Sequence, residues 1–159
     1  MFQRFRPAAF AALFVALGVA GCALADSKKP SALPVETVTV ISKTGAHTFK
    51  AEIADDDAER QKGLMFRENM ADTQAMLFEF PDAAERSFWM RNTYIPLDII
   101  YIGPDGRIVS IAREARPFDE TPLPSYAPAT GVLEINGGLT SKLGIEPGDR
   151  VEHPFFKKR

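Results

Sequence analysis

The chain has 159 residues, of which 45% are hydrophobic and 25% are charged, and its formal net charge is −2. This length is enough for one domain with a real hydrophobic core. The mild acidity argues against a nucleic-acid-binding protein, because such affinity comes mainly from basic side chains that neutralise phosphates.

The first residues have the pattern of a secretory signal peptide. Arg4 and Arg6 give a positive start, and residues 7–20 carry no charge. This uncharged run is shorter than the roughly 20 residues that a membrane-spanning helix needs, and it fits the apolar region of an export signal. Residues 19–22, VAGC, resemble the lipobox of bacterial lipoproteins. The resemblance implies that residues 1–21 are removed and that Cys22 becomes the lipid-carrying first residue.

A second processing site leaves an alternative. Ala23-Leu24-Ala25 is an A-x-A pattern, and cleavage after Ala25 would release a soluble periplasmic protein. Cys22 is the only cysteine, and an exported protein meets an oxidising compartment in which a lone thiol makes no internal disulfide. Lipidation explains its presence, so we expect a membrane-anchored lipoprotein of the cell envelope. Resemblance to known sorting rules, with alanine after the cysteine, favours the outer membrane.

The segment that follows has the composition of a flexible tether. Residues 23–34 have little apolar bulk and two prolines, and these twelve residues reach at most about 40 Å. With Cys22 they form the expected tether, residues 22–34. Without residues 1–21 the chain keeps 17 Lys+Arg against 21 Asp+Glu, a net charge of −4. We therefore expect a single domain over residues 35–153, kept near its membrane, and a basic tail at 154–159.

Short strands and frequent turns follow in chain order. Residues 35–41, VETVTVI, and residues 47–54 alternate as the two strands of a hairpin do. Asp55 is the expected N-cap of a short helix over 56–62, and Gly63 is its expected stop. Further strands are predicted at 75–80 and 87–90.

The clearest hairpin joins strands at 97–102 and 107–112 through the turn Gly103-Pro104-Asp105-Gly106. The first of these, LDIIYI, is apolar on both faces, so we expect it to be covered on both sides. Four prolines in residues 116–129 predict a long loop. The remaining elements are predicted as a strand at 132–135, a helical turn at 140–143, a type II turn at 146–149 and a strand at 150–152.

This order of elements predicts a mainly β fold, namely a compact antiparallel β-sandwich or barrel-like domain with one or two short helices. The edge strands of such a domain are free to pair with another chain. Both a monomer and a homodimer therefore remain open.

Five blocks of the sequence resemble the domain of unknown function 192 family. They are GLMFRENM (63–70), MLFEF (76–80), FWMRNTYIPLDIIYI (88–102), VLEINGG (132–138) and GIEPGDRV (144–151). The resemblance runs from about Val35 to Val151 and implies a compact, mainly β, often exported domain without an established activity. It leads us to expect a lysine before the Asn-Thr pair, where this chain has Arg91, which keeps the charge and adds a planar fork of donors.

The polar residues of these blocks form the candidate ligand-binding site. Asp98 and Glu134 lie on otherwise apolar strand faces, which is costly for a carboxylate unless it is paired. Arg91 and Arg67 are the expected partners. We expect a cleft walled by aromatic side chains, with the 116–129 loop as its rim. The site residues are Arg67, Trp89, Arg91, Asn92, Thr93, Asp98, Tyr126, Glu134 and Asn136, and Phe66 is expected in the wall.

Structural roles are the alternative for the same residues. Arg91 would then bond backbone carbonyls, Asn92 would take a left-handed turn conformation, and Thr93 would close a turn. Asp98 or Glu134 would neutralise an arginine. The polar set would in that case pin a strand crossover.

Several chemistries find no support in the sequence. There is no C-x-x-C, H-E-x-x-H or G-x-S-x-G motif, and the only histidines are His47 and His153. We predict no metal and no cofactor. Four methionines would suit copper(I), but they lie in apolar runs where methionine is a common core residue, namely Met65, Met70, Met76 and Met90.

Two functions remain. The first is a non-catalytic accessory or binding module of the cell envelope that holds a small polar ligand, a glycan or an envelope protein, with Trp89 and Arg91 as anchors. The second is a carbohydrate-active hydrolase or lyase with Asp98 and Glu134 as general acid and base. That chemistry needs the two carboxyl groups roughly 5 to 9.5 Å apart across an open cleft.

Overall fold

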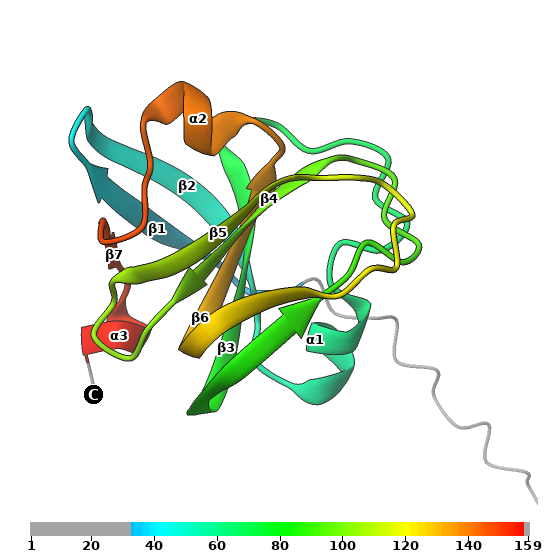
Figure 1. Cartoon of the computed structure of the whole chain (residues 1–159), viewed down its shortest axis with the longest axis horizontal. Helices are drawn as coiled ribbons and strands as arrows, with labels where there is room; N and C mark the ends of the chain where they lie inside the picture. Colours follow the sequence, from blue (N-terminus) through cyan, green and yellow to red (C-terminus); the bar gives the residue numbers. More distant parts are fainter. Residues whose placement is uncertain (1–32, 158–159) are drawn as a thin grey trace, which may run out of the picture. The chain divides into compact units, whose positions relative to one another are not determined.

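Seven strands and three short helices make up the described part of the chain, residues 33–157 of the computed structural model (Figure 1). Cys22, the signal peptide and most of the tether lie outside these residues. The elements are β1 (Val35–Ser42), β2 (Gly45–Ala54), α1 (Asp57–Lys62), β3 (Gln74–Phe88), β4 (Leu97–Ile102), β5 (Ile108–Ala115), β6 (Leu123–Asn136), α2 (Leu139–Leu143), β7 (Arg150–Glu152) and α3 (Pro154–Lys157). The predicted mainly β class is confirmed, with one helix more than expected.

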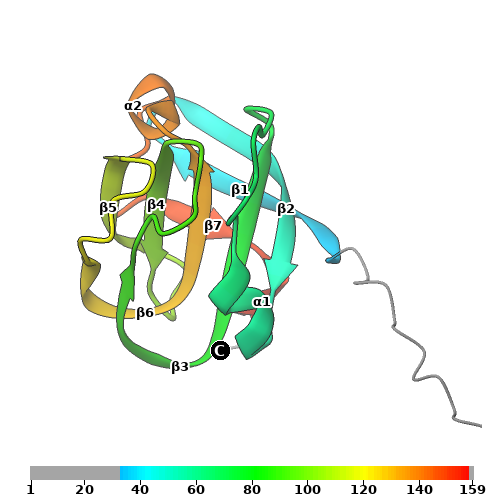
Figure 2. The same ribbon diagram turned by 90° about the vertical axis from the view of Figure 1, so that its right-hand side faces the viewer.

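All seven strands belong to one sheet in the order β5-β4-β6-β3-β2-β1-β7. The sheet curls, as Figure 2 shows, and its two ends meet where Arg107 bridges Arg150. There the Ile108 amide donates to the Asp149 carbonyl at 2.9 Å and the Val151 amide donates to the Gly106 carbonyl at 2.7 Å. The barrel-like form is therefore confirmed, with contact between its edges at this end.

One strand pair departs from the antiparallel prediction. β2 and β3 are parallel, and α1 with the loop after it forms the crossover between them. A parallel pair needs such a connection because the chain must return to the same end of the sheet. This crossover carries α1 to the outer side of β3, which matters for the site described below.

The inside of the curl is filled by one hydrophobic cluster to which every strand contributes. Its members include Val38, Val40, Phe49, Ile53, Leu77, Ile100, Ile102, Ile108, Leu133, Ile135 and Val151. A second cluster covers the other face of β3, β4 and β6, and it includes Leu64, Met76, Phe78, Met90, Ile99, Tyr101 and Val132. Strand alternation sends neighbours such as Leu77 and Phe78 to different clusters. All six residues of β4 are buried, so its predicted cover on both sides is confirmed.

Two strands are longer than the sequence predicts. β3 is one strand from Gln74 to Phe88, where two were expected, and β6 begins at Leu123, so the predicted 116–129 loop is too long. Register shifts between β3 and β6 let this pair contain prolines, with Pro128 opposite Glu85. Prolines are tolerated at such irregularities because the ladder hydrogen bonds are interrupted there.

Helix α1 begins with a capping box. Asp56, one residue after the expected Asp55, is the N-cap, and its carboxylate accepts from the Glu59 amide at 2.8 Å. The Glu59 side chain accepts in return from the Asp56 amide. These two bonds satisfy backbone donors that have no partner within the helix.

The C-terminal residues are part of the folded unit. α3 occupies residues 154–157 of the expected tail, and Phe156 packs in the inner cluster. The ring of His153 lies 3.0 Å from a Glu36 oxygen and 3.4 Å from a Glu79 oxygen. Burial lowers the pKa of His153, and the nearby Glu36 carboxylate opposes that effect.

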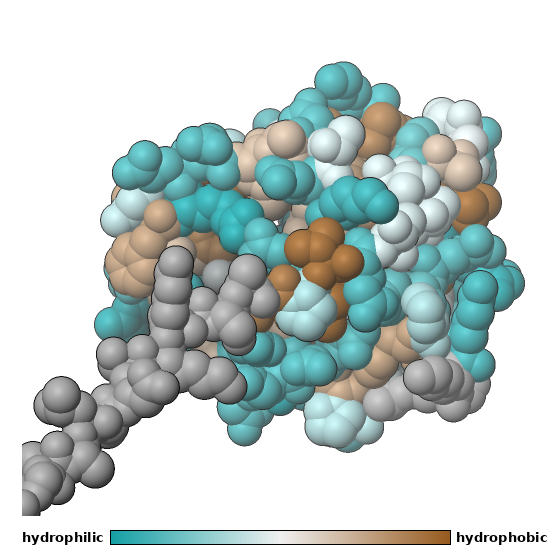
Figure 3. Space-filling view, turned by 180° about the vertical axis from the view of Figure 1, so that it is seen from behind, coloured by the Kyte–Doolittle hydropathy of each residue, from teal (hydrophilic) through white to brown (hydrophobic). Residues whose placement is uncertain are grey.

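The face turned away from the viewer of Figure 1 is largely hydrophilic, broken by small hydrophobic groups (Figure 3). Within residues 33–157, no helix is long and apolar enough to cross a bilayer.

Candidate ligand-binding site

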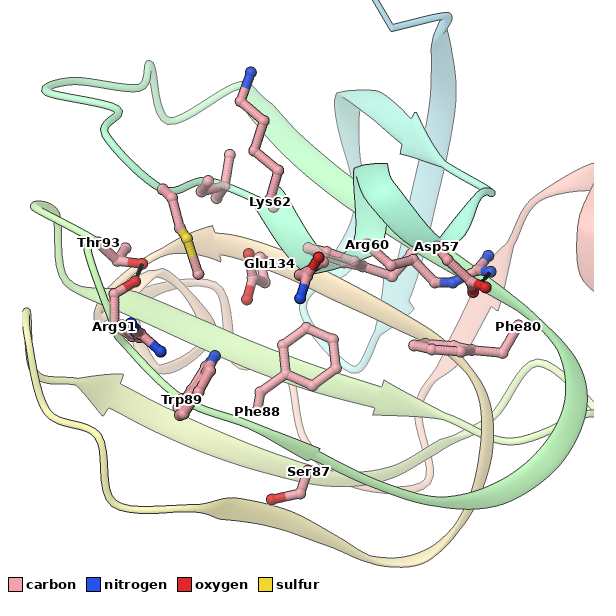
Figure 4. Close-up of a pocket in the computed structure, with 15 residues that line it drawn as sticks. Asp57, Arg60, Lys62, Phe80, Ser87, Phe88, Trp89, Arg91, Thr93 and Glu134 are labelled. Carbon is pink, nitrogen blue, oxygen red and sulfur yellow. Dashed lines mark hydrogen bonds and ion pairs between the residues drawn. The ribbon is translucent and has the colours of Figure 1, made fainter.

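A pocket of about 320 Å³ lies between α1, β3 and the loop that follows β3 (Figure 4). Most of its lining comes from these segments, and Glu134 enters from β6. The lining residues are Asp57, Arg60, Gln61, Lys62, Gly63, Leu64, Met65, Phe78, Phe80, Ser87, Phe88, Trp89, Arg91, Thr93 and Glu134. Pockets of this volume are in the range that takes a small molecule.

Glu134 is the buried acid of this pocket. It lies opposite Met76 of β3 and Ile99 of β4, so its side chain points to the outer cluster, and it is only 4% exposed. Among residues 33–157, none forms a hydrogen bond or ion pair with its carboxyl group. Burial raises the pKa of Glu134 to about 8. Near neutral pH the group is therefore mostly protonated, and it is available to a ligand.

Aromatic rings form one side of the pocket. The Phe88 ring meets the Phe78 ring edge to face at 5.0 Å, and behind it the Tyr101 ring at 6.0 Å. In Figure 4 the Glu134 carboxyl lies in the middle of the pocket, with Phe88 and Trp89 on one side and Lys62 on the other. Trp89 is 46% exposed and stands at the mouth.

Three basic side chains reach the pocket, and they differ in what holds them. Arg60 donates to the Glu79 carbonyl at 2.7 Å and pairs with Asp57 at 2.7 Å. The Arg91 guanidinium lies over the Trp89 ring, 5.5 Å from its centre. Lys62 and Arg91 are exposed, and neither has an ion pair with a residue of the described range. Arg91 is therefore not the partner of Glu134 that the sequence suggests.

The turn after β3 gives Asn92 and Thr93 structural roles. Asn92 has a φ of 54°, the left-handed conformation, and its carbonyl accepts from the Phe66 amide at 2.8 Å. The Thr93 amide donates to the Met90 carbonyl at 3.1 Å, and its hydroxyl donates to the Arg91 carbonyl at 3.2 Å. These bonds fix the loop that carries Trp89 and Arg91. Thr93 also lines the pocket, and Asn92 lines a hollow beside it.

Asp98 lies on the opposite face of the sheet from Glu134. It is fully buried and accepts from the Glu114 amide at 2.7 Å, from the Gly138 amide at 3.0 Å and from both the amide and the hydroxyl of Thr140 at 2.8 and 2.6 Å. These bonds tie β4 to the start of α2 and to β5. The expected pair of carboxylates across an open cleft is therefore not formed. Asp98 is paired with Ile135, the neighbour of Glu134, so the side chains of Asp98 and Glu134 point to opposite faces of the sheet.

The other three candidates lie away from the pocket. Arg67 pairs with Glu52 at 2.7 Å. The Asn136 amide donates to the Met70 carbonyl at 2.8 Å and to an Asp72 oxygen at 2.9 Å, so it holds the loop before β3. Tyr126 is 81% exposed on β6 and does not line the pocket.

The expected wall residue Phe66 belongs to a neighbouring surface. Its ring packs against Tyr94 at 6.2 Å, and Tyr94 packs against Phe118 at 5.4 Å. All three are exposed, and they lie on three different loops. The backbone is left-handed at Phe66 and Phe118, with φ values of 64° and 63°.

Sequence reasoning missed the contribution of α1 to the pocket. Gln61 and Lys62 carry no local signal of a site, since an exposed polar helix is the ordinary result of their composition. Only the parallel crossover brings this helix over β3, next to Glu134. The aromatic residues of β3 gave a weak signal, because Phe80 and Phe88 are only partly buried although they belong to a strand of the sheet.

Within residues 33–157, no cluster of three or more His, Cys, Asp or Glu side chains is placed to hold a metal ion.

The fold and the pocket define a small, mainly β domain built on one curled sheet, with a buried acid beneath an aromatic-walled pocket. The chain belongs to the domain of unknown function 192 family, described as Uncharacterized ACR, whose model matches residues 39–153. No curated protein matches the sequence.

The solved structures that are similar to this chain include the following two. A protein of unknown function from Novosphingobium aromaticivorans DSM 12444 is 51% identical, with a TM-score of 0.76 over 78% of this chain and 89% of that chain. A protein from Sinorhizobium meliloti 1021, described as "a putative transcription regulator", is 40% identical, with a TM-score of 0.74 over 76% of this chain and 95% of that chain. The similarity covers the curled sheet and assigns no activity.

Proposed function

We propose that this protein is a non-catalytic binding module of the cell envelope, and that the pocket over Glu134 takes a small polar ligand. Trp89 and Arg91 stand at its mouth as anchors. The observation that carries the proposal is the buried carboxyl of Glu134, which faces the pocket without a partner among residues 33–157.

The other buried carboxyl and the buried imidazole of this region are both satisfied. Asp98 accepts four hydrogen bonds, and His153 lies between Glu36 and Glu79. Glu134 is the exception, because its carboxyl faces the pocket and no residue among 33–157 pairs with it, so a ligand can do so. This contrast supports a binding site over a purely structural role for Glu134.

The location belongs to the same proposal. The lipobox-like sequence before Cys22 supports a lipid anchor in the outer membrane, with a soluble periplasmic form after cleavage at Ala25 as the alternative. The tether would keep the start of the domain within about 40 Å of the anchor. Ligands within that reach include envelope glycans, peptides and free small molecules.

A role in transcription is not favoured, although one structural relative is described as a regulator. The described helices have at most six residues, so none has the length of a recognition helix that lies in the major groove. The net charge of −4 without residues 1–21 also disfavours binding to phosphates.

Hydrolysis of sugars is not favoured either. Asp98 is sealed on the other face, and the second carboxylate in the pocket, Asp57, pairs with Arg60. Glu134 is left as a single acid, whereas glycoside hydrolysis uses two carboxyl groups that flank the bond.

Amide-resolved NMR of the protein without its signal peptide tests the binding function. The panel contains sugars, amino acids, dipeptides, amines and carboxylic acids. We expect at least one compound to shift the pocket resonances, with affinity lowered tenfold or more by Arg91→Ala. Arg150→Ala is the matched control, because that arginine lies on β7 and outside the pocket. Shifts at no pocket residue with any compound would overturn the proposal.

A further inference from the structure

The chemistry of the pocket points to the class of its ligand, and this inference rests on the proposed function. We propose that the ligand is a zwitterion of the amino-acid type, whose ammonium group binds Glu134 between the aromatic rings and whose acidic group meets Lys62 and Arg91. Four features of the pocket support this ligand class: the missing positive charge at its base, its aromatic wall, its basic mouth and its volume.

The base of the pocket lacks a positive charge. Glu134 is 4% exposed, and none of residues 33–157 supplies it with a cation or a hydrogen-bond donor. A buried carboxylate is stable only when it is paired and hydrogen-bonded. An ammonium group brings a full charge and up to three donors in one compact group. A neutral hydroxyl would supply a donor without the charge.

The wall suits the same group. Phe78, Phe88 and Trp89 line the pocket, and the faces of such rings attract organic cations. Phe88 is held edge to face against both Phe78 and Tyr101, so the wall is fixed before a ligand arrives. Aromatic rings are a recurring means of recognising ammonium groups.

The mouth of the pocket is positively charged, in contrast to its acidic base. Lys62 and Arg91 are exposed and have no ion pair in the described range, whereas Arg60 is held by Asp57 and by backbone carbonyls. Two free cations at the mouth repel a simple amine, and they attract a ligand whose outer end is a carboxylate or phosphate. A zwitterion with its ammonium end inward satisfies both regions of the pocket.

The volume allows such a molecule. About 320 Å³ is at the lower end of the range for small-molecule sites, so an amino acid or a short amino-acid derivative fits and a folded protein segment does not. The pocket is open on the side of Trp89, where a longer ligand would continue into the hollow lined by Met65, Trp89 and Arg91.

The pH dependence of affinity separates this ligand class from others. The groups around Glu134 are Tyr101 of β4, Asp57, Arg60 and Lys62 of α1, and Arg91 of the loop after β3, and β3 contributes apolar residues. Burial raises the pKa of Tyr101, whose hydroxyl donates to the Leu123 carbonyl. Tyr101 is therefore neutral over the pH range of the experiment.

The sign of the effect follows from Glu134. With a pKa of about 8, its carboxyl is protonated below that pH in the empty pocket. An ammonium ligand binds the carboxylate, so one proton leaves when it binds at lower pH. Affinity then rises almost tenfold for each pH unit up to about 8 and levels off above it. A ligand that only accepts a hydrogen bond from the protonated acid keeps the same affinity well below pH 8 and weakens as the pH passes through and above that value.

Four small probes test the ligand class by NMR titration at pH 6, 7 and 8. They are 6-aminohexanoate, hexylamine, hexanoate and 6-acetamidohexanoate. We expect 6-aminohexanoate to bind most tightly, acetylation of its amine to weaken it tenfold or more, and its affinity to rise with pH. Arg91→Ala should weaken 6-aminohexanoate and leave hexylamine unchanged or tighter.

Glu134→Gln is the central variant, because it keeps the shape of the protonated acid. It should weaken 6-aminohexanoate tenfold or more and remove the pH dependence, while an unchanged amide spectrum outside the pocket shows that the fold is kept. Trp89→Leu, at an exposed position, provides a second variant that is expected to weaken both amines.

The outcomes distinguish the two proposals. If hexanoate or 6-acetamidohexanoate binds as tightly as 6-aminohexanoate, or if the affinity for 6-aminohexanoate does not rise between pH 6 and pH 8, the ligand class is wrong. It is also wrong if no probe binds while other compounds of the panel shift the pocket residues, and the binding function then stands. If nothing binds in the pocket, both proposals are wrong.

Discussion

Asp98 and Glu134 project to opposite faces of the same sheet from the paired strands β4 and β6. Asp98 accepts four hydrogen bonds that hold α2 and β5, whereas Glu134 faces a pocket without a partner in residues 33–157. The same type of side chain therefore contributes to stability on one face and is available to a ligand on the other.

The pH dependence of stability should reveal the buried acid. The pKa of Glu134 is about 8 in the fold and near 4.3 in the unfolded chain, so the folded state holds this proton more tightly. The contribution of protonated Glu134 to the free energy of unfolding is full at low pH. It is lost between about pH 4.5 and 8, by roughly 1.4 kcal/mol per pH unit. Urea unfolding of wild type and Glu134→Gln at several pH values measures this. The stability of Glu134→Gln relative to wild type should increase as the pH rises. If the two plots of unfolding free energy against pH are parallel, Glu134 does not have the raised pKa of a buried acid.

Removal of the Asp98 carboxylate should destabilise the domain strongly. Asp98→Ala leaves the amides of Glu114, Gly138 and Thr140 without their acceptor. We expect a loss of about 3–5 kcal/mol in the free energy of unfolding, by analogy with broken buried networks. The control is Glu120→Ala at an exposed loop position, expected within about 0.5 kcal/mol of wild type. A small loss for Asp98→Ala would show that these bonds are not essential.

The left-handed turn at Asn92 gives a matched pair of variants. With φ at 54°, alanine is strained at this position and glycine is not. Asn92→Ala should lower the stability by about 1 kcal/mol, and Asn92→Gly should change it little. Thermal unfolding of both compares them directly. Equal losses would mean that the Asn92 side chain, and not its backbone conformation, holds the loop.

The C-terminal helix should be required for the full stability of the domain. Phe156 is 6% exposed in the inner cluster, so Phe156→Ala leaves a cavity and should cost about 3–5 kcal/mol. Phe118→Ala is the control, because that ring is 61% exposed. A chain that stops at residue 153 should lose at least as much as Phe156→Ala. Wild-type stability of the shortened chain would place the domain boundary before α3.

The expected lipid anchor on Cys22 can be tested in a bacterial host that processes lipoproteins. The full chain should incorporate labelled palmitate and remain with the membrane fraction. Cys22→Ala should lose both the label and the membrane association. A soluble, unlabelled wild-type protein whose mature form begins after Ala25 would support the alternative cleavage site instead.

Local interactions explain why several elements could be predicted. The hairpin turn at 103–106 has the expected glycine with a φ of 77°, and Gly144 stops α2 in the left-handed conformation. The helix after residue 55 follows from its acidic start and basic end, and only its N-cap differs by one residue. Each of these features depends on residues within a few positions, which are present in the sequence itself.

The predictions that were wrong concern features that depend on contacts between distant segments of the chain. The long β3 and β6 pair each other across bulges that contain prolines, and no local pattern distinguishes such a proline from one in a loop. The sequence singled out Trp89, Arg91, Thr93 and Glu134, which do line the pocket, but it paired Glu134 with the wrong partners.

The sequence by itself determined the mainly β class, the family and the polar residues that needed explanation, because strand alternation and turn chemistry are local. Only the tertiary structure decided which carboxyl is sealed and which is open to a ligand. The physical reason is that strand pairing sets the register and the face of the sheet to which each side chain points. The pairing of β4, β6 and β3 points Asp98 inward and Glu134 outward. The parallel crossover between β2 and β3 then places α1 over Glu134.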